Sequence, residues 1–431
     1  MGTMRAAAAA LALGLLLVAA GCGNSTAATG TSSGTDAASL VPASALAYVS
    51  ADANLDSQSW QVVSDLVGPI GTDVDYKRDI QPALGDRVNL AGLGVDNGEP
   101  EAVAIVKPTD VAKLQALAKK FDRGTEHYTV ESIAGWSVVA DSAAAFQAVR
   151  NASTGSSLAD DANFKSAMSQ VGGAAFATAY ASGSGVEQLP AKLRALVRVA
   201  GTPRWVAARI TADKSALHLE ARAAGAATPA AYKPALLSDV PSGAILAVSF
   251  KDADQLLARI QAEPTLRASL PPFLNGLSSL GGEGVLYLLS GTLLPVITLE
   301  VQPRDPAAAA KSLRTLAAKA SQLLPLRVER RGNKVLLTNS AAGASPSGGS
   351  LIEDQPFKDA LAAADVPAEV TWLAYADIQR LAPILQALAS LTGKGQTKPS
   401  STLKLEKFGT LVAFGAHSGS MSRLEARLTI P

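Results

Sequence analysis

The chain has 431 residues, 48% hydrophobic and 5% aromatic, and its 38 Lys and Arg nearly balance its 37 Asp and Glu. This balance argues against a nucleic-acid partner held by charge and against a polybasic membrane contact, and the scarcity of aromatic residues argues against base-stacking or sugar-binding platforms. A chain of this length exceeds what one compact core organises, so two domains are predicted.

The N-terminus has the pattern of a secretory signal that ends in a lipidation motif. Arg5 precedes an apolar run from Ala6 to Ala20, which is shorter than the roughly 20 residues that a membrane span needs. Small residues end the run directly before Cys22, the only cysteine of the chain. We therefore expect residues 1–21 to be a signal peptide and Cys22 to carry lipid, such as diacylglycerol and palmitate, that holds a lipoprotein on the extracytoplasmic face of the cell membrane. A plain secretory signal with an incidental cysteine and a buried N-terminal helix are the alternatives.

The segment after the cysteine consists almost entirely of Gly, Ser, Thr, Ala and Asn. Such a composition cannot bury apolar surface, so residues 22–39 are predicted to form a lipid-anchored flexible tether. Its length would hold the body about 20–25 Å from the bilayer. The folded part is expected to begin at Leu40.

From Leu40 on, one series of motifs occurs twice in the same order. Val41-Pro42 returns as Val240-Pro241, 199 residues later, and Leu219-Glu220-Ala221-Arg222 returns letter for letter at 424–427, 205 residues later. Three further pairs lie between these two: 106–110 with 301–305, 157–165 with 350–358, and 179–181 with 374–376. The shared order predicts a tandem duplication, with a first copy at 40–225, a linker at 226–234 and a second copy at 235–431. Chance self-similarity of a chain rich in Ala and Leu is the alternative.

Within a copy, strand-like segments alternate with amphipathic helices. Strands are expected at 46–50, 102–106, 136–140, 174–180, 205–211 and 217–222. Asp110 is placed to cap a helix that starts at Val111, and Asp305 followed by Pro306 opens its counterpart. Asp96-Asn97-Gly98 predicts a tight hairpin turn. These features predict an α+β fold in which each copy has a largely antiparallel sheet with helices on one face.

Residues suited to catalysis or metal binding are few. His127, His218 and His417 are not at metal-ligand spacing, so we expect surface or rim positions for all three. Gly30–Gly34 fits a nucleophile elbow but lies in the tether, and Ser401–Lys404 fits a Ser-x-x-Lys motif without its partner motifs. The glycines at 92, 94 and 98 miss the dinucleotide-binding spacing. We therefore expect no catalytic, cofactor-binding or metal-binding residues.

Two features recur in both copies and suit either structure or binding. Asp160-Asp161 and Glu353-Asp354 precede a Phe-Lys helix start, where acids favour the helix dipole, and a weak cation site is the alternative. Tyr180 and Tyr375 end equivalent strands. Packing in the core or at its rim is the expected role for these tyrosines, and contact with a ligand is the alternative.

The series of motifs resembles the domain-of-unknown-function family 3352 of extracytoplasmic bacterial proteins. The resemblance rests on the lipoprotein-type signal, the Val-Pro strand with Tyr48, Leu84-Gly85, the helix start at 106–110, and the Ser-Leu, Phe-Lys and Ala-Tyr-Ala motifs, and it covers about 40–431. It implies an exported or membrane-attached protein without an established activity, and it supplies no site residues. The second copy departs from the pattern by having Ala247 in place of Tyr48.

These observations predict a non-enzymatic, lipid-anchored protein of the cell envelope that serves as a binding or scaffold module. The expected partners are the membrane, reached through the N-terminal lipid, and another envelope protein or a lipid; a nucleic-acid partner is not expected. The first alternative is a carrier of a lipid or other apolar ligand, with a cavity lined by 285–288 and 293–299. The second is an envelope hydrolase, for which the sequence offers no nucleophile beside a base.

Overall fold

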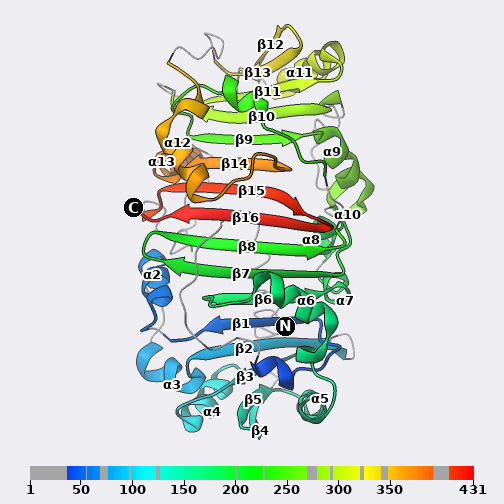
Figure 1. The fold of residues 1–431 in the computed structure, drawn as a ribbon, viewed down its shortest axis with the longest axis vertical. Coiled ribbons are helices and arrows are strands. Elements are labelled where there is room, and N and C mark those ends of the chain that lie inside the picture. Colours follow the sequence, from blue (N-terminus) through cyan, green and yellow to red (C-terminus); the bar gives the residue numbers. More distant parts are fainter. Residues whose placement is uncertain are drawn as a thin grey trace. The chain divides into compact units, whose positions relative to one another are not determined.

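The computed structural model describes residues 36–431 except 55, 68–75, 97–98, 123–126, 190, 200, 227–228, 269–278, 292–294, 321–324, 341–347 and 392–406. These residues form two compact units. The first holds the described residues up to Leu189 and from Thr202 to Ala226, and the second holds those between Pro190 and Gly201 and those after Ala226. Each unit combines helices with a large antiparallel sheet, as the sequence predicts (Figure 1).

The sheet of the first unit has the strand order β4-β5-β3-β2-β1-β6-β7-β8, and every neighbouring pair is antiparallel. The first and sixth strands of the chain are neighbours in this sheet, where Tyr48 of β1 pairs with Tyr180 of β6. The strands are β1 (Ala47–Asp52), β2 (Arg87–Asp96), β3 (Glu99–Val106), β4 (Thr129–Ile133), β5 (Trp136–Ala140), β6 (Ala177–Ser182), β7 (Trp205–Asp213) and β8 (Ala216–Ala224).

The sheet of the second unit has the strand order β12-β13-β11-β10-β9-β14-β15-β16, again antiparallel throughout. Counted from the first strand of each unit, this is the order found in the first unit. The strands are β9 (Leu246–Lys251), β10 (Gly282–Leu289), β11 (Val296–Pro303), β12 (Arg327–Arg331), β13 (Lys334–Thr338), β14 (Trp372–Asp377), β15 (Thr410–Ser418) and β16 (Met421–Thr429).

Helices connect these strands. The first unit has η1 (Asp36–Leu40), α2 (Gln58–Val67), the π-helical turn η2 (Tyr76–Ile80), α3 (Gln81–Leu84), α4 (Val111–Lys120), α5 (Ala143–Thr154), η3 (Leu158–Asp160), α6 (Ala162–Val171) and α7 (Gly183–Glu187). The second has α8 (Ala191–Val199), η4 (Ala235–Asp239), α9 (Ala253–Ala262), α10 (Pro264–Arg267), α11 (Pro306–Ala320), η6 (Leu351–Glu353), α12 (Gln355–Ala363) and α13 (Ile378–Leu391). Among the described residues, no helix has both the length and the apolarity to cross a membrane.

Helices cover both faces of the sheet in the first unit, so the prediction of one helical face is wrong. Phe164 of α6 packs on Tyr48 and Tyr180, on one face. Leu114 of α4 belongs to a cluster that includes Leu90, which pairs with Val49 and therefore faces the opposite side from Tyr48. The strands explain why both faces are covered. β6 is buried at five consecutive residues, so both of its faces need a covering layer, whereas strict alternation would leave one face polar.

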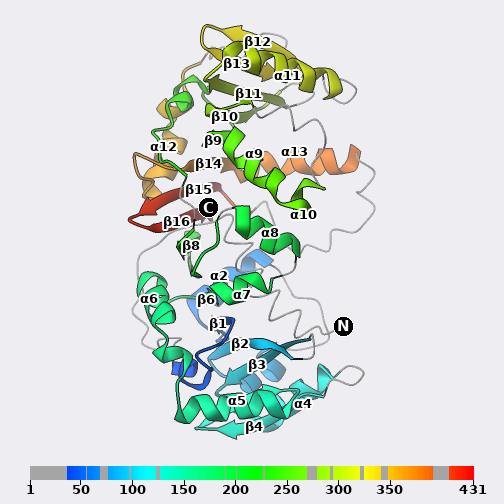
Figure 2. The ribbon, with the colours of Figure 1, turned by 90° about the vertical axis from the view of Figure 1, so that its right-hand side faces the viewer.

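The second unit is covered in the same way. Phe357 of α12 packs on Tyr375, while Leu313 of α11 packs with Val301 and Val335 on the other face of the sheet. Figure 2 shows α11 lying beside β12 and β13. The helix begins where the sequence predicts, since Asp305 Oδ1 accepts hydrogen bonds from the backbone N–H groups of residues 307 and 308.

Part of the range assigned to the tether is helical. Residues Asp36–Leu40 form the 3-10 helix η1, and Ala37 and Ala38 are buried. Of the sequence expectations, the signal peptide, Cys22 and the tether up to residue 35 lie outside the described residues.

Candidate functional site

The recurring tyrosines form the centre of a repeated aromatic contact. Phe164 meets Tyr180 edge to face with ring centroids 5.1 Å apart, and Phe357 meets Tyr375 at 5.1 Å in the same geometry. Burial raises the pKa of Tyr180 to about 12 and also raises the pKa of Tyr375. Both phenols are therefore neutral at physiological pH, and their rings have the packing role that was expected.

The second unit has Ala247 where the first unit has Tyr48, and a tyrosine on the neighbouring strand takes its place. Tyr48 of β1 pairs directly with Ala91 of β2. In the second unit Ala247 of β9 pairs directly with Tyr287 of β10, so the large and small residues have exchanged strands. Tyr48 and Tyr287 are both fully buried. The exchange keeps one tyrosine and one alanine in this pair of positions in each unit.

The hydroxyl groups of these two tyrosines have different environments. The Tyr48 hydroxyl donates to Asn89 Oδ1 at 2.9 Å, and Asn89 Nδ2 donates to the carbonyl of Ile105 at 3.0 Å. Tyr287 instead pairs across strands with Thr298, whose hydroxyl lies 2.8 Å from that of Thr338. A ligand contact through Tyr48 would have to break the buried bond to Asn89.

The paired acids act mainly as helix caps. Asp160 accepts a hydrogen bond from the Ser157 hydroxyl at 2.7 Å in a capping box, and this bond lowers the pKa of the Asp160 carboxyl. Asp161 caps α6 by accepting from the Phe164 N–H at 2.8 Å. Three protein donors thus hold these carboxylates, namely the Ser157 N–H, the Ser157 hydroxyl and the Phe164 N–H, which favours the structural interpretation.

The second unit keeps the capping box and changes the second acid. Glu353 completes the box with Ser350. Asp354 reaches across the fold, where it accepts from the Ser242 hydroxyl and from the Gly243 N–H, each at 2.6 Å. Both acids of this pair are therefore also held by protein donors.

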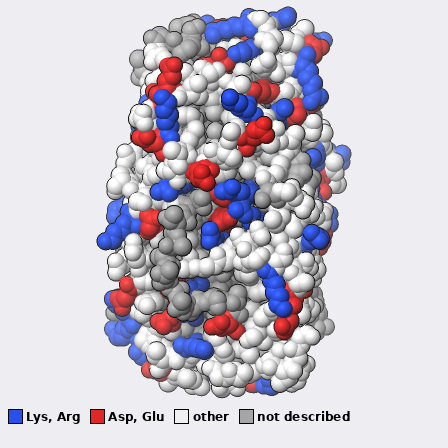
Figure 3. All heavy atoms as spheres, in the orientation of Figure 1, with Lys and Arg blue, Asp and Glu red and all other residues white. Residues whose placement is uncertain are grey.

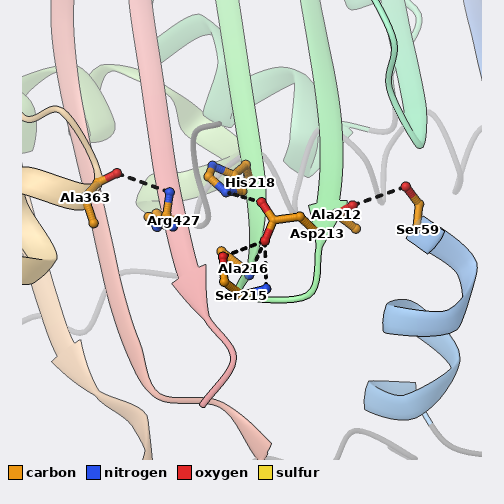
Figure 4. A network of polar contacts seen from close by, with 8 residues as sticks. All are labelled: Ser59, Ala212, Asp213, Ser215, Ala216, His218, Ala363 and Arg427. Atoms are coloured by element: carbon orange, nitrogen blue, oxygen red, sulfur yellow. Dashed lines mark hydrogen bonds and ion pairs between the residues drawn. The ribbon is translucent and has the colours of Figure 1, made fainter. Parts of the chain in front are cut away.

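The β7–β8 hairpin gathers an aspartate, a serine and a histidine (Figure 4). Asp213 Oδ1 accepts from the Ser215 hydroxyl at 2.6 Å and from the Ser215 and Ala216 N–H groups at 2.7 and 3.0 Å. His218 is buried, and its Nε2 lies 3.4 Å from Asp213 Oδ2. The prediction of a surface or rim position is therefore wrong for His218, which two-residue alternation along β8 places on an inward face.

The order of contacts in this cluster does not suit nucleophilic catalysis. A catalytic triad needs the histidine between the serine and the acid, so that the imidazole can take the serine proton. Here Asp213 stands between Ser215 and His218. Burial alone would raise the pKa of Asp213, but the hydrogen bonds from Ser215 and Ala216 and the neighbouring His218 hold it below its usual value. The cluster closes the hairpin turn.

Of the other two histidines, His127 is exposed and His417 is half-buried at the rim. His127 Nδ1 lies 3.5 Å from Asp122 Oδ2 beside the start of β4, and His417 Nε2 lies 2.5 Å from the carbonyl of Pro229. Their positions agree with the prediction. In the described part of the chain, no three His, Cys, Asp or Glu side chains are grouped so that they could hold a metal ion.

Charged residues inside the sheets were missed by the sequence reasoning. Glu300 of β11 is buried and lies 3.7 Å from Lys334 Nζ, which also contacts Asp239 at 2.5 Å. Burial and the charge of Asp239 raise the pKa of Glu300, and Lys334 opposes that shift. The sequence held one indication of this burial. Two-residue alternation along β11 places Glu300 on the same face as Thr298.

The duplicated Leu-Glu-Ala-Arg motif also holds buried carboxylates. Glu220 of β8 contacts Arg222 and lies 2.7 Å from Arg209, and Glu425 of β16 contacts Arg423. The two glutamates are almost completely buried. Paired burial of this kind is weak evidence for stability and does not by itself define a site.

Gly30–Gly34, Asn97-Gly98 and Ser401–Lys404 lie outside the described residues. Gly92 and Gly94 flank a bulge in β2. Of the segments expected to line a cavity, Val285 belongs to a packed cluster with Phe357 and Tyr375, and Leu299 packs against the cluster around Leu313.

Comparison of the chain with models of protein families gave no match, and neither curated protein sequences nor solved structures gave a significant match. The resemblance to family 3352 therefore stays a prediction.

Proposed function

We propose that this protein is a non-enzymatic lipoprotein of the cell envelope, anchored through Cys22, whose body serves as a binding or scaffold module. The observation that carries the proposal is the role of the recurring polar and aromatic residues. The acids at 160–161 and 353–354 are held by protein donors, and Tyr180 and Tyr375 pack against phenylalanines. The features repeated in the chain thus serve folding, which favours a module that presents its surface over one built around a reactive centre.

We further propose that the two units arose by tandem duplication. The proposal is supported by their common strand order and by a local feature that recurs in each unit. In each unit a Ser-Leu turn bridges to a Val-Pro segment, through Pro42 with Ser157 and Pro241 with Ser350. An experimental structure in which the two sheets superpose strand for strand would support the duplication, and sheets that fail to superpose would contradict it.

The anchor is tested by replacing the thiol. In cells that express Cys22→Ser, the protein should lose palmitate labelling and move from the membrane fraction to the soluble fraction. Ser25→Ala, three residues further along the same segment, is the matched control and should stay with membranes. Unchanged membrane retention and labelling of Cys22→Ser would overturn the proposed anchor.

The scaffold role is tested by crosslinking the full chain in living cells and identifying what is attached. Recovery of one envelope protein in a fixed ratio would support a scaffold. Stoichiometric lipid in the purified protein would instead favour a carrier, and labelling by a covalent serine probe would favour a hydrolase.

A further inference from the structure

The near-neutral charge of the whole chain conceals a strongly basic region in the second unit. The segment from Pro306 to Thr338, which spans α11, β12 and β13, contains seven Lys and Arg and a single acid, Glu329, for a net charge of +6. Since the whole chain has a net charge of +1, the remaining residues together carry −5. The corresponding segment of the first unit, residues 111–140, carries only +1. The excess is therefore a property of this segment and not of the repeated fold.

Ion pairs neutralise the cations on one side of the sheet. Glu329 contacts Arg327 and Arg331, which share its face of β12 by alternation. Lys334 contacts Asp239 and Glu300. These pairs account for three of the seven cations.

The other four cations lie on the side of the sheet that α11 covers. Within the described residues, none of these four has a carboxylate partner, and all four are exposed: Lys311, Arg314, Lys319 and Arg330. The first three lie on the outer side of α11, whose inner side packs through Leu313 and Ala317. Arg330 follows two residues after Val328, which packs against the same cluster, so Arg330 extends from the same face. Figure 3 shows Lys and Arg side chains at the end of the second unit where Figure 1 labels β12, with Asp and Glu side chains beside them.

Helix stability does not explain this set. Lys319 lies in the last turn of α11, where a cation favours the helix dipole. Lys311 and Arg314 lie in the middle of the helix and have no acid at the positions where an i to i+4 pair would form. Like charges three residues apart repel each other, so these positions carry a small cost in the isolated protein.

We propose that this surface, formed by Lys311, Arg314, Lys319 and Arg330, docks onto an anionic phospholipid bilayer. Exposed cations without carboxylate partners attract a layer of phosphate headgroups. The segment 306–338 contains no aromatic residue, and the other exposed residues of α11 are small, namely Ala307, Thr315 and Ala318. A specific protein interface is typically centred on buried aromatic anchors, and a single-stranded nucleic acid requires stacking platforms, so a bilayer fits this surface better than either.

The inference rests on the proposed function only for the location of the protein beside a membrane. The docking itself needs no acyl chain, because the attraction depends on charge and falls off within a Debye length of the headgroups. It would also favour one orientation, since the negatively charged remainder of the chain is repelled by the same bilayer.

The test uses residues 22–431 without the lipid, as Cys22→Ser, mixed with vesicles of phosphatidylcholine alone or with one third phosphatidylglycerol. The protein should sediment with the anionic vesicles and stay in solution with the neutral ones. Substituting Lys311, Arg314 and Lys319 together by Glu should weaken the binding at least about tenfold, because each cation near the surface contributes measurably. About 0.5 M NaCl should release the protein from the vesicles, since it shortens the Debye length to a few ångströms.

The matched control reverses three charges on the corresponding helix of the first unit, as Lys113, Lys119 and Lys120 to Glu. It should bind as the parent does, within about twofold. Circular dichroism and the unfolding midpoint verify that each variant is folded, and glutamine at the three α11 positions supplies a milder version. Equal losses in the α4 and α11 variants, or equal binding to neutral vesicles, would overturn the proposal. Binding to soluble polyphosphate or to an acidic protein without binding to vesicles would overturn it in favour of that partner. The fractionation of Cys22→Ser decides the anchor separately.

Discussion

Phe164 meets Tyr180 edge to face, with ring centroids 5.1 Å apart and ring planes 84° apart, and Phe357 meets Tyr375 at 5.1 Å and 83°. Each phenylalanine enters from the first turns of a helix that a capping box precedes. The cap fixes where the helix starts, and the helix start fixes where the ring enters the core. Aromatic contacts of this geometry add about 0.5–1.5 kcal/mol beyond the area they bury.

Removing either ring should destabilise the protein strongly. We expect Phe164→Ala and Phe357→Ala each to lower the free energy of unfolding by about 3–5 kcal/mol, because the truncation leaves a cavity in a core without access for solvent. Urea unfolding followed by fluorescence measures the change. Phe121→Ala at the end of α4 is the control, and since its ring is 39% exposed it should cost less than about 1.5 kcal/mol. Equal losses at the buried and exposed positions would contradict the assigned packing.

The exchanged tyrosine and alanine should be energetically coupled. Tyr48→Ala alone is expected to cost about 3–5 kcal/mol, and Ala91→Tyr alone should cost about 1–3 kcal/mol through overpacking. The double variant reproduces the arrangement of Ala247 and Tyr287, so we expect it to recover about 2 kcal/mol or more relative to the sum of the single changes. A double-mutant cycle on unfolding free energies measures this coupling. Strict additivity would show that the two side chains do not share one space.

Gly85 should be sensitive to a single added carbon. It ends α3 with φ of +72°, and a Cβ there would lie 2.0 Å from the carbonyl oxygen of Lys107. Gly135 in the β4–β5 turn has a similar φ of +79° but open space around it, so it isolates the backbone term. We expect Gly135→Ala to lower the free energy of unfolding by about 1–2 kcal/mol. Gly85→Ala should lower it by about 1–3 kcal/mol more, because only the added carbon at Gly85 pushes a helix and a strand apart. Thermal unfolding of both variants tests the difference, and identical midpoints would refute the predicted clash.

Glu300 should reduce stability at neutral pH. Burial raises its pKa in the folded state above the value in the unfolded chain, so the folded state binds the proton more tightly. The cost of this carboxylate is therefore present above its folded pKa and is relieved as pH falls through that value towards the unfolded one. We expect Glu300→Gln to be more stable than the parent at pH 7 by about 1 kcal/mol and equal to it in acid.

Denaturant unfolding across the acid to neutral range measures this pH dependence. Glu329→Gln on the neighbouring strand is the control, and we expect a change below about 1 kcal/mol at every pH because its pairs with Arg327 and Arg331 are partly solvated. A parent that is more stable than Glu300→Gln at pH 7 would mean that the attraction to Lys334 outweighs the burial of the charge.

Helix caps and some strand bounds could be predicted from the sequence. Asp110 caps α4 by accepting from the Lys113 N–H, and Asp305 with Pro306 opens α11, as their residue types predict. The strand at 136–140 has the predicted bounds. These features depend on neighbours within a few residues, where hydrogen-bond geometry and backbone preference decide the outcome. The sequence also determined the repeated order of motifs and the suitability of Cys22 for a lipid anchor.

Only the tertiary structure decided which residues meet across strands. The replacement of Tyr48 by Tyr287 depends on strand pairing between segments about forty residues apart, and the burial of His218 and Glu300 depends on what covers each face of a sheet. Two-residue alternation gives the face of a side chain but not the layer above it, which is why helices on both faces were not foreseen. The cations of α11 without carboxylate partners could also be identified only from the structure. The sequence does not show which of the neighbouring cations form ion pairs.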